Sequence, residues 1–229
     1  MFEADGSKKP QLLDLSSENA EGESQDQVHE ILQTEEGEPP FTYEQKLLAL
    51  CLVISSFSCG LLYANVTSFL PVFAADKYEG HVTATQYSII ISLFNVGGVL
   101  GSPIHAITIS KIGRKTSLGI GFIITIVCTA GMGAASFYPA KAYVPFVVLT
   151  SAFRLVQGYG DSLIIAVSYS IVNIYFQTGK TYLIGYMETM QGLGLICGPL
   201  IGSVVYAGFG YRNTYYCFAA VILFNLVLI

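Results

Sequence analysis

The stretch Ser110-Lys111-Ile112-Gly113-Arg114-Lys115 is a short basic segment between two long apolar runs, at about 85–109 and 118–138. An α-helix that crosses a bilayer needs about 20 apolar residues, and it tolerates charged side chains only at its ends or inside a bundle. Both runs meet this requirement, and the segment between them is long enough only for a tight turn. It therefore predicts two antiparallel transmembrane helices joined by a basic loop.

Similar apolar runs continue on both sides of this pair. Of the 229 residues, 52% are hydrophobic and only 12% are charged, and the mean hydropathy is +0.56. So many apolar helices cannot all be buried in a water-soluble protein of this size. We therefore predict an all-α membrane protein with a six-helix transmembrane domain at 46–229. Its helices are expected at about 47–73, 85–109, 118–138, 144–176, 183–207 and 214–229.

The charge of the chain is concentrated at its N-terminal end. Residues 1–45 contain 12 acidic side chains against Lys8 and Lys9, whereas the rest of the chain has 4 acidic and 9 basic side chains. The first segment has too little apolar surface to offset the entropy of ordering. We expect 1–45 to be a disordered, acidic tail. The basic residues beyond it are scattered, which excludes a nucleic-acid-binding face.

Topology is predicted from the basic residues in the loops, because cytosolic loops are enriched in Lys and Arg. With the tail in the cytosol, five basic residues flank the cytosolic ends of the helices and three flank the outer ends. The cytosolic set is Lys46, Lys111, Arg114, Lys115 and Lys180. We expect a multi-pass protein of the plasma membrane or of an intracellular vesicle membrane, with its N-terminus in the cytosol.

No catalytic or metal-binding pattern is present in the sequence. The five cysteines show neither a CxxC pair nor a Cys/His spacing suited to a metal, and they lie in apolar surroundings. A nucleophile elbow and a phosphate-binding loop are also absent. We therefore predict that the protein is not an enzyme and needs no cofactor, and that a proton or ion gradient supplies the energy for any transport.

Two segments inside the apolar runs carry specific motifs. The fourth run contains Arg154-Leu-Val-Gln157-Gly158-Tyr-Gly160, and the fifth contains Gly194-Leu-Ile-Cys-Gly198-Pro199-Leu-Ile-Gly202-Ser203. An Arg in the middle of a membrane helix is costly unless it has a partner or faces a wet cavity. The glycines of both motifs, Gly158, Gly160, Gly194, Gly198 and Gly202, allow close approach of another helix, and Pro199 can bend its own helix.

These motifs resemble those of the major facilitator superfamily. The loop Lys111, Gly113, Arg114 and Lys115 resembles the end of the family's gating loop, although Ser110 replaces the family's Asp and Ala106 its first Gly. The Arg154 motif resembles one associated with proton-coupled members, and the Gly198-Pro199 motif resembles one typical of antiporters. The run Glu188-Thr189 before that motif resembles the vesicular amine transporter group, especially its polyamine-type members.

The resemblance implies the N-terminal six-helix half of a major facilitator fold. The implied activity is secondary active transport of a small organic solute, with a cationic amine as one candidate, by alternating access with proton coupling. The implied partners are the solute, protons, the lipid bilayer and a C-terminal six-helix half, from the same gene or a second copy. The alternative is a truncated or non-transporting six-helix membrane protein.

Three intramembrane charges are candidate proton-coupling residues: Arg154, Asp161 and Glu188. Arg154 and Asp161 are seven residues apart and share a helix face, so they are either a structural ion pair or a coupling element. Glu188 either couples a proton or pairs with Arg154. Proton coupling is possible because burial disfavours the charged form of a carboxylate, which would let it bind and release a proton. The polar residues expected along the substrate pathway are Asn65, Gln157 and Gln191.

Overall fold

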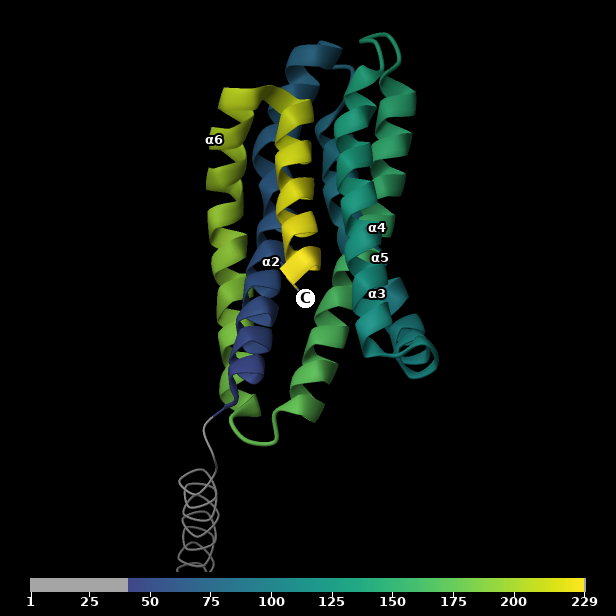
Figure 1. Ribbon diagram of the computed structural model, residues 1–229. Coiled ribbons are helices and arrows are strands. Elements are labelled where there is room, and N and C mark those ends of the chain that lie inside the picture. The colour runs from purple at the N-terminus through teal and green to yellow at the C-terminus, as the bar shows by residue number, and fades with distance from the viewer. Residues whose placement is uncertain (1–40, 229) are drawn as a thin grey trace, which may run out of the picture. The chain divides into compact units, whose positions relative to one another are not determined.

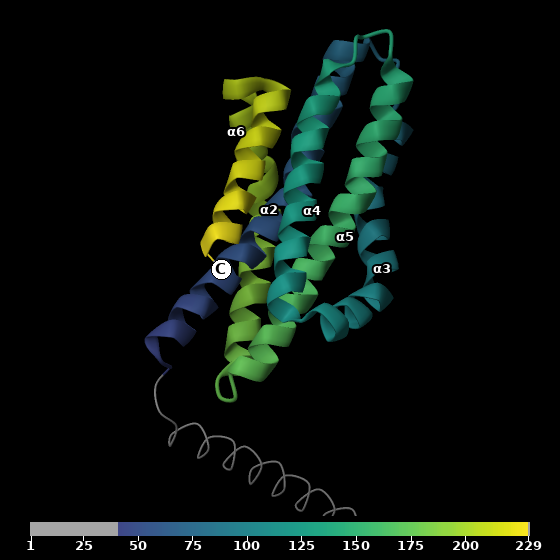
Figure 2. The same cartoon turned by 45° about the vertical axis from the view of Figure 1, so that its right-hand side comes forward.

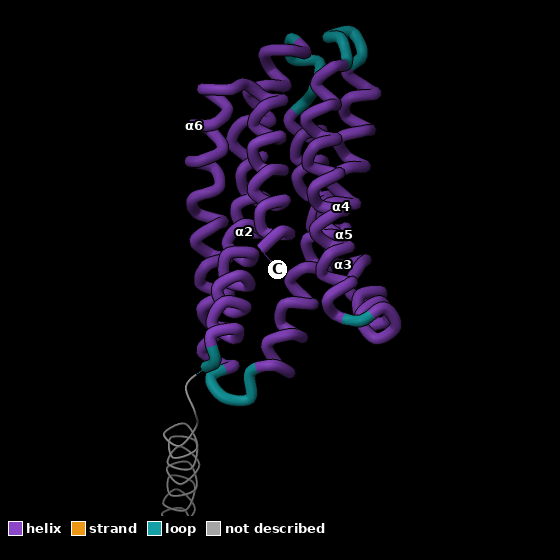
Figure 3. Tube along the Cα trace, viewed as in Figure 1, coloured by secondary structure: helices purple, strands orange, loops and turns teal. Residues whose placement is uncertain are grey.

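The computed structural model describes residues 41–228, and all of its described helices belong to one compact unit, Thr42–Ile229. This unit is helical, and no strand occurs in the described residues, so the all-α prediction is confirmed (Figure 1). Figure 3 shows that its loops are confined to the ends of the helices. The elements are α2 (Tyr43–Tyr78), α3 (Ala84–Ile112), α4 (Arg114–Ala134), η1 (Ala135–Phe137), α5 (Tyr143–Tyr175) and α6 (Lys180–Leu228).

The last element, α6, comprises two antiparallel arms rather than one straight helix. The backbone of Gly210 has a φ of 73° and breaks the helical geometry there, and Figure 1 shows the chain turning back at this end of the bundle. Gly202 in the first arm lies against Asn65, whereas Asn225 in the second arm donates a hydrogen bond to Ser58. The fifth and sixth expected helices therefore exist, but one glycine separates them in place of the expected loop at 208–213.

Helices α2 and α3 begin and end outside the expected bounds, because helical hydrogen bonding continues past the apolar core into polar flanks, whereas both ends of α5 differ from the expected 144–176 by one residue. Thr42 and Thr83 cap α2 and α3, and their backbone N–H groups donate to Gln45 and Gln86, at 3.0 and 2.9 Å. Helix α2 consequently begins at Tyr43, inside the segment expected to belong to the tail. Residues 1–40 of that expected tail lie outside the described residues.

The third helix begins at Arg114 instead of 118, because a single residue, Gly113, separates it from α3. The backbone of Gly113 has a φ of 88°, a value that residues with a Cβ atom rarely adopt. At its other end α4 ends at Ala134 and the short η1 helix follows, so the α-helix ends before residue 138, the expected last residue. The connection predicted from the sequence as a basic loop is thus a turn of one residue, Gly113.

The helices pack in pairs. Helix α2 packs mainly against α6, α3 packs against α5, and α4 contacts both α5 and α6 (Figures 1 and 2). One cluster of buried apolar side chains includes Leu52, Leu118 and Val172, near the α3–α4 turn, and a second cluster includes Phe69 and Tyr215 nearer the opposite ends. The pairs leave α3 and the first arm of α6 in contact with the core along one side only.

Length and composition allow all five long helices of the described chain to cross a membrane. Many of their large apolar side chains are exposed; Ile196, for example, retains 75% of its accessible surface and Val99 retains 72%. Exposure of this much apolar surface is unfavourable in free energy in water, whereas contact of the same side chains with lipid tails is not. The membrane prediction is therefore supported by side-chain placement as well as by hydropathy.

Candidate functional site

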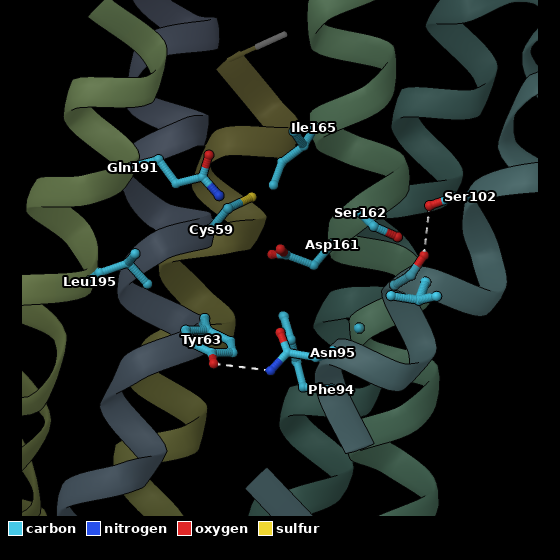
Figure 4. Close-up of a pocket in the computed structure, with 13 residues that line it drawn as sticks. Cys59, Tyr63, Phe94, Asn95, Ser102, Asp161, Ser162, Ile165, Gln191 and Leu195 are labelled. Atoms are coloured by element: carbon cyan, nitrogen blue, oxygen red, sulfur yellow. Dashed lines mark hydrogen bonds between the residues drawn. The ribbon is translucent and has the colours of Figure 1, made fainter. Parts of the chain in front are cut away.

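A cavity of about 460 Å³ lies between α2, α3, α5 and the first arm of α6 (Figure 4). Its volume falls within the usual range for small-molecule sites. Its walls combine one carboxylate with amide, hydroxyl, thiol and aromatic groups. They are formed by Cys59, Tyr63, Phe94, Asn95, Gly98, Val99, Ser102, Gly158, Asp161, Ser162, Ile165, Gln191 and Leu195.

Asp161 is the acidic residue of this cavity. Its side chain is 4% exposed, the carboxylate oxygen Oδ1 has no hydrogen-bond partner, and the thiol of Cys59 contacts the same carboxylate. Figure 4 shows the side chain directed into the cavity, toward Cys59 on α2. Buried carboxylates are almost always paired. Asp161 is therefore positioned to bind a proton or a cation that enters the cavity.

Arg154, the other charge of α5, has neutral partners. Its side chain is fully buried; Nη1 donates to Gln157 Oε1 at 2.8 Å, and Nη2 donates to the backbone carbonyl of Tyr63 at 2.9 Å. The guanidinium also lies 4.8 Å from the ring centroid of Phe94. Gln157 in turn donates to Thr129 of α4, so the network connects α5 with α2, α3 and α4.

No direct ion pair joins Arg154 to Asp161 in the described part of the chain, although the two opposite charges attract each other at longer range. Seven residues span about 10.5 Å of helix axis, and the short Asp side chain cannot cover that distance to a guanidinium held by Tyr63 and Gln157. Glu188 does not pair with Arg154 either, since its side chain is exposed. The two charges of α5 therefore have different direct partners.

The expected substrate-pathway residues are separated by the fold. Gln191 lines the cavity, whereas Gln157 belongs to the Arg154 network and Asn65 is fully buried outside the cavity wall. Sequence reasoning missed Asn95, whose side-chain amide donates to the Tyr63 hydroxyl at 3.1 Å. An amide in the middle of an apolar run was a signal that could have identified it.

The motif glycines lie where helices approach most closely. A Cβ on Gly158 would collide with the backbone carbonyl of Phe94 on α3, and one on Gly160 would lie 2.8 Å from Thr125 Oγ1 on α4. Gly194 and Gly198 meet the backbone of α2, and Pro199 beside them is half-buried. These contacts agree with the expectation of close packing at both motifs.

A family model for the Major Facilitator Superfamily matches residues 49–229. The chain belongs to this superfamily. It is similar to the MFS-type transporter SLC18B1 of Mus musculus, with 23% identity over 81% of this chain and 39% of the relative. The same protein of Homo sapiens is 24% identical over 82% of this chain and 40% of the relative. The multidrug resistance protein MdtG of Proteus mirabilis is 22% identical over 80% and 44%.

The family resemblance drawn from the motifs is therefore confirmed. This major facilitator chain spans about two-fifths of the length of these relatives. Its match begins within α2 and includes every helix that follows. Together with the apolar helices, the match identifies an integral multi-pass membrane protein.

The residues expected from the resemblance to form a gating loop lie at the α3–α4 turn. Lys111 and Lys115 are exposed, whereas Arg114 is half-buried and its Nε donates to Ser170 Oγ of α5 at 2.9 Å. Ser110, at the position of the family's Asp, bonds back to the carbonyl of Ile107 in its own helix. The turn is thus fastened to α5 through Arg114.

Proposed function

We propose that this chain forms the N-terminal half of a secondary active transporter that moves a small organic cation by alternating access, coupled to protons. Family membership and the similarity to named transporters support transport rather than enzymatic catalysis. The observation that carries the proposal is the buried Asp161 carboxylate, whose Oδ1 has no hydrogen-bond partner, in a cavity lined by four helices. A C-terminal half, from the same gene or a second copy, would close the open side of this cavity.

The cavity wall favours a cationic solute. Asp161 is its acidic residue, no basic side chain lines it within the described residues, and Tyr63, Asn95 and Gln191 add aromatic and amide contacts. An ammonium group is attracted both by a carboxylate and by an aromatic ring. An anionic solute would meet the Asp161 charge without a compensating cation, so a cationic amine is the substrate class that fits best.

The Asp161 carboxylate also supports proton coupling. A buried Asp161 is neutralised either by a proton or by the ammonium of the solute, and binding of one disfavours binding of the other. Such competition is the condition for antiport, because each cation that enters the cavity displaces a proton. Glu188 is exposed on the first arm of α6 and remains the second candidate for coupling.

Asp161→Asn tests this function in the full-length protein reconstituted into vesicles. We expect uptake of radiolabelled spermidine, driven by a pH gradient, to fall at least roughly tenfold, because loss of one partner of a buried charged pair costs about 2–5 kcal/mol. Folding should be retained, since the hydrogen bonds of the buried Arg154 guanidinium go to Gln157 and Tyr63 and none goes to Asp161. Asp76→Asn, an exposed site at the end of α2, is the matched control. Unchanged uptake by Asp161→Asn, with normal expression, would refute the proposal.

We also propose that the N-terminus and the α3–α4 turn face the cytosol, because the loop bases cluster there. Ser110 and Ala140 are exposed and lie at opposite ends of the bundle. In intact cells, a membrane-impermeant thiol reagent should label Ala140→Cys and leave Ser110→Cys unlabelled. If the protein resides in an intracellular vesicle, isolated sealed vesicles, whose outer face is the cytosolic face, replace the cells. The reagent should then label Ser110→Cys and leave Ala140→Cys unlabelled. The opposite pattern in either preparation would contradict this orientation.

A further inference from the structure

A second cavity, of about 310 Å³, lies at the end of the bundle where α6 turns back at Gly210 (Figure 1). Its walls come from three segments: the last turns of α2, the η1 turn after α4, and the turn between the two arms of α6. Two wall residues are basic, Lys77 and Arg212, and we call it the Lys77–Arg212 cavity. It shares no wall residue with the cavity around Asp161, so it is a separate candidate site.

The two bases contact consecutive residues of η1. Lys77 Nζ donates a hydrogen bond to the backbone carbonyl of Ser136. The Arg212 guanidinium lies 5.3 Å from the ring centroid of Phe137, which is the next residue of the same turn. One short turn therefore brings a charge from α2 and a charge from α6 to the same cavity.

Aromatic rings form the wall behind the bases. The Phe73 ring centroid lies 5.4 Å from Lys77 Nζ, and the same ring stacks on Tyr211 with 3.7 Å between centroids. Tyr211 is buried and directly precedes Arg212 in the chain. This packing fixes the end of α2 against the start of the second arm of α6, so the positions of the two bases are set before any ligand binds.

Neither base is neutralised by an acid of the described chain. The two acidic residues nearest in sequence, Asp76 and Glu79, do not line the cavity, and no other acid is among its wall residues. Lys77 uses one of its three N–H groups on Ser136, and the Arg212 side chain makes no hydrogen bond within the described residues. Two like charges at one cavity repel each other, and a bound anion would remove this repulsion.

The cavity lies at the level where a membrane places phosphate groups. Helices α2, α4 and α6 are long and apolar enough to cross a bilayer, and the cavity is formed where they end or turn. Lipid phosphates lie just outside the hydrocarbon core, and Lys and Arg side chains near helix ends reach this level. Two apolar wall residues, Phe137 and Phe209, are 69% and 63% exposed. An acyl chain can therefore pack beside the bases.

We infer that the Lys77–Arg212 cavity is a binding site for a phosphate group, with a membrane lipid as the source that the exposed rings favour. The remaining N–H groups of Lys77 and the guanidinium of Arg212 donate to the phosphate oxygens. Two positive charges match a phosphomonoester, which carries a charge of about −1.5 to −2 at pH 7. The first turn of the second arm of α6 also lines the cavity, and its helix dipole adds a partial positive charge. The inference is independent of the transported solute and of the coupling ion.

Native mass spectrometry of the full-length protein, titrated in detergent with dioleoylphosphatidate, tests the site. One base near a lipid phosphate contributes about fivefold in affinity. We therefore expect Arg212→Gln and Lys77→Gln each to weaken binding of the first lipid about fivefold, and the double variant about 25-fold. Glutamine at 77 retains an N–H donor for the Ser136 carbonyl. Lys141→Gln is the matched control, because Lys141 is an exposed base at the same end of the bundle that does not line the cavity.

Two further ligands separate the phosphate from the acyl chains. Dioleoylglycerol has the same chains without a phosphate, and we expect it to bind about 25-fold more weakly than phosphatidate, because both base contacts are lost. Equal affinities for these two lipids would overturn the inference. An equal loss of affinity in Lys141→Gln and Arg212→Gln would also overturn it. Inorganic phosphate has no acyl chain; if it displaces phosphatidate at equal concentration, the phosphate site is supported and the lipid source is rejected.

Thermal unfolding without added lipid controls for folding. Arg212 is exposed and makes no hydrogen bond through its side chain within the described residues, so Arg212→Gln should melt with the parent. Its lipid affinity decides the test if Lys77→Gln folds poorly.

Discussion

Gly194→Ala is expected to destabilise the folded protein more than any other single-methyl change in the first arm of α6. A Cβ at this position would collide with the carbonyl oxygen of Phe57 and would lie 2.7 Å from the backbone nitrogen of Leu61. Both atoms belong to the backbone of α2, which cannot rotate away as a side chain can. Separating the two helices costs about 1–3 kcal/mol or more, as in other overpacked cores.

Gly192→Ala is the matched control, because the same methyl group at Gly192 has no neighbour within 4 Å. Alanine is the better helix former by about 1 kcal/mol, so this variant should melt at or above the temperature of the parent. Thermal unfolding of the detergent-purified protein, followed by size-exclusion chromatography, measures both variants. Equal melting temperatures for Gly194→Ala and Gly192→Ala would contradict the close contact between α2 and α6.

The transmembrane segments could be predicted from the sequence because charge is excluded from the bilayer core. Lys111, Lys141 and Lys180 each lie at a helix end or in a loop, so they bounded the apolar runs. The ends themselves were missed by several residues, since caps such as Thr42 and Thr83 extend a helix into polar sequence. The reversal at Gly210 was hidden because a turn that needs only one residue leaves almost no interruption in hydropathy.

The site was predictable only in part. Burial of Arg154 and Asp161 followed from their places in an apolar run, but their partners come from other helices. The carbonyl of Tyr63 that binds Arg154 is a backbone group, and no side-chain pattern identifies it. The buried His105 of α3 met the same difficulty, because its hydroxyl partner, Ser162 of α5, lies 57 residues away. Spacing along one helix finds residues on a common face, whereas the partner across the interface depends on the packing of helices.

Arg154→Lys is expected to destabilise the protein strongly although the charge is conserved. The guanidinium donates from two nitrogens at once, to Gln157 of its own helix and to Tyr63 of α2, and it also lies over the Phe94 ring. A lysine ammonium is a compact charge that cannot reproduce this planar arrangement. Each hydrogen bond to a charged group contributes about 1.5–3 kcal/mol, so losing one of them and the ring contact should lower stability by about 2–4 kcal/mol.

Arg212→Lys is the matched control for this substitution. Arg212 is exposed at the start of the second arm of α6, and its guanidinium lies 5.3 Å from the ring centroid of Phe137. At an exposed site a cation near a ring contributes only about 0.5–1 kcal/mol, and lysine can retain part of it. The melting temperature should therefore fall clearly for Arg154→Lys and hardly change for Arg212→Lys. If both variants melt with the parent, the buried network of Arg154 does not hold α2 against α5.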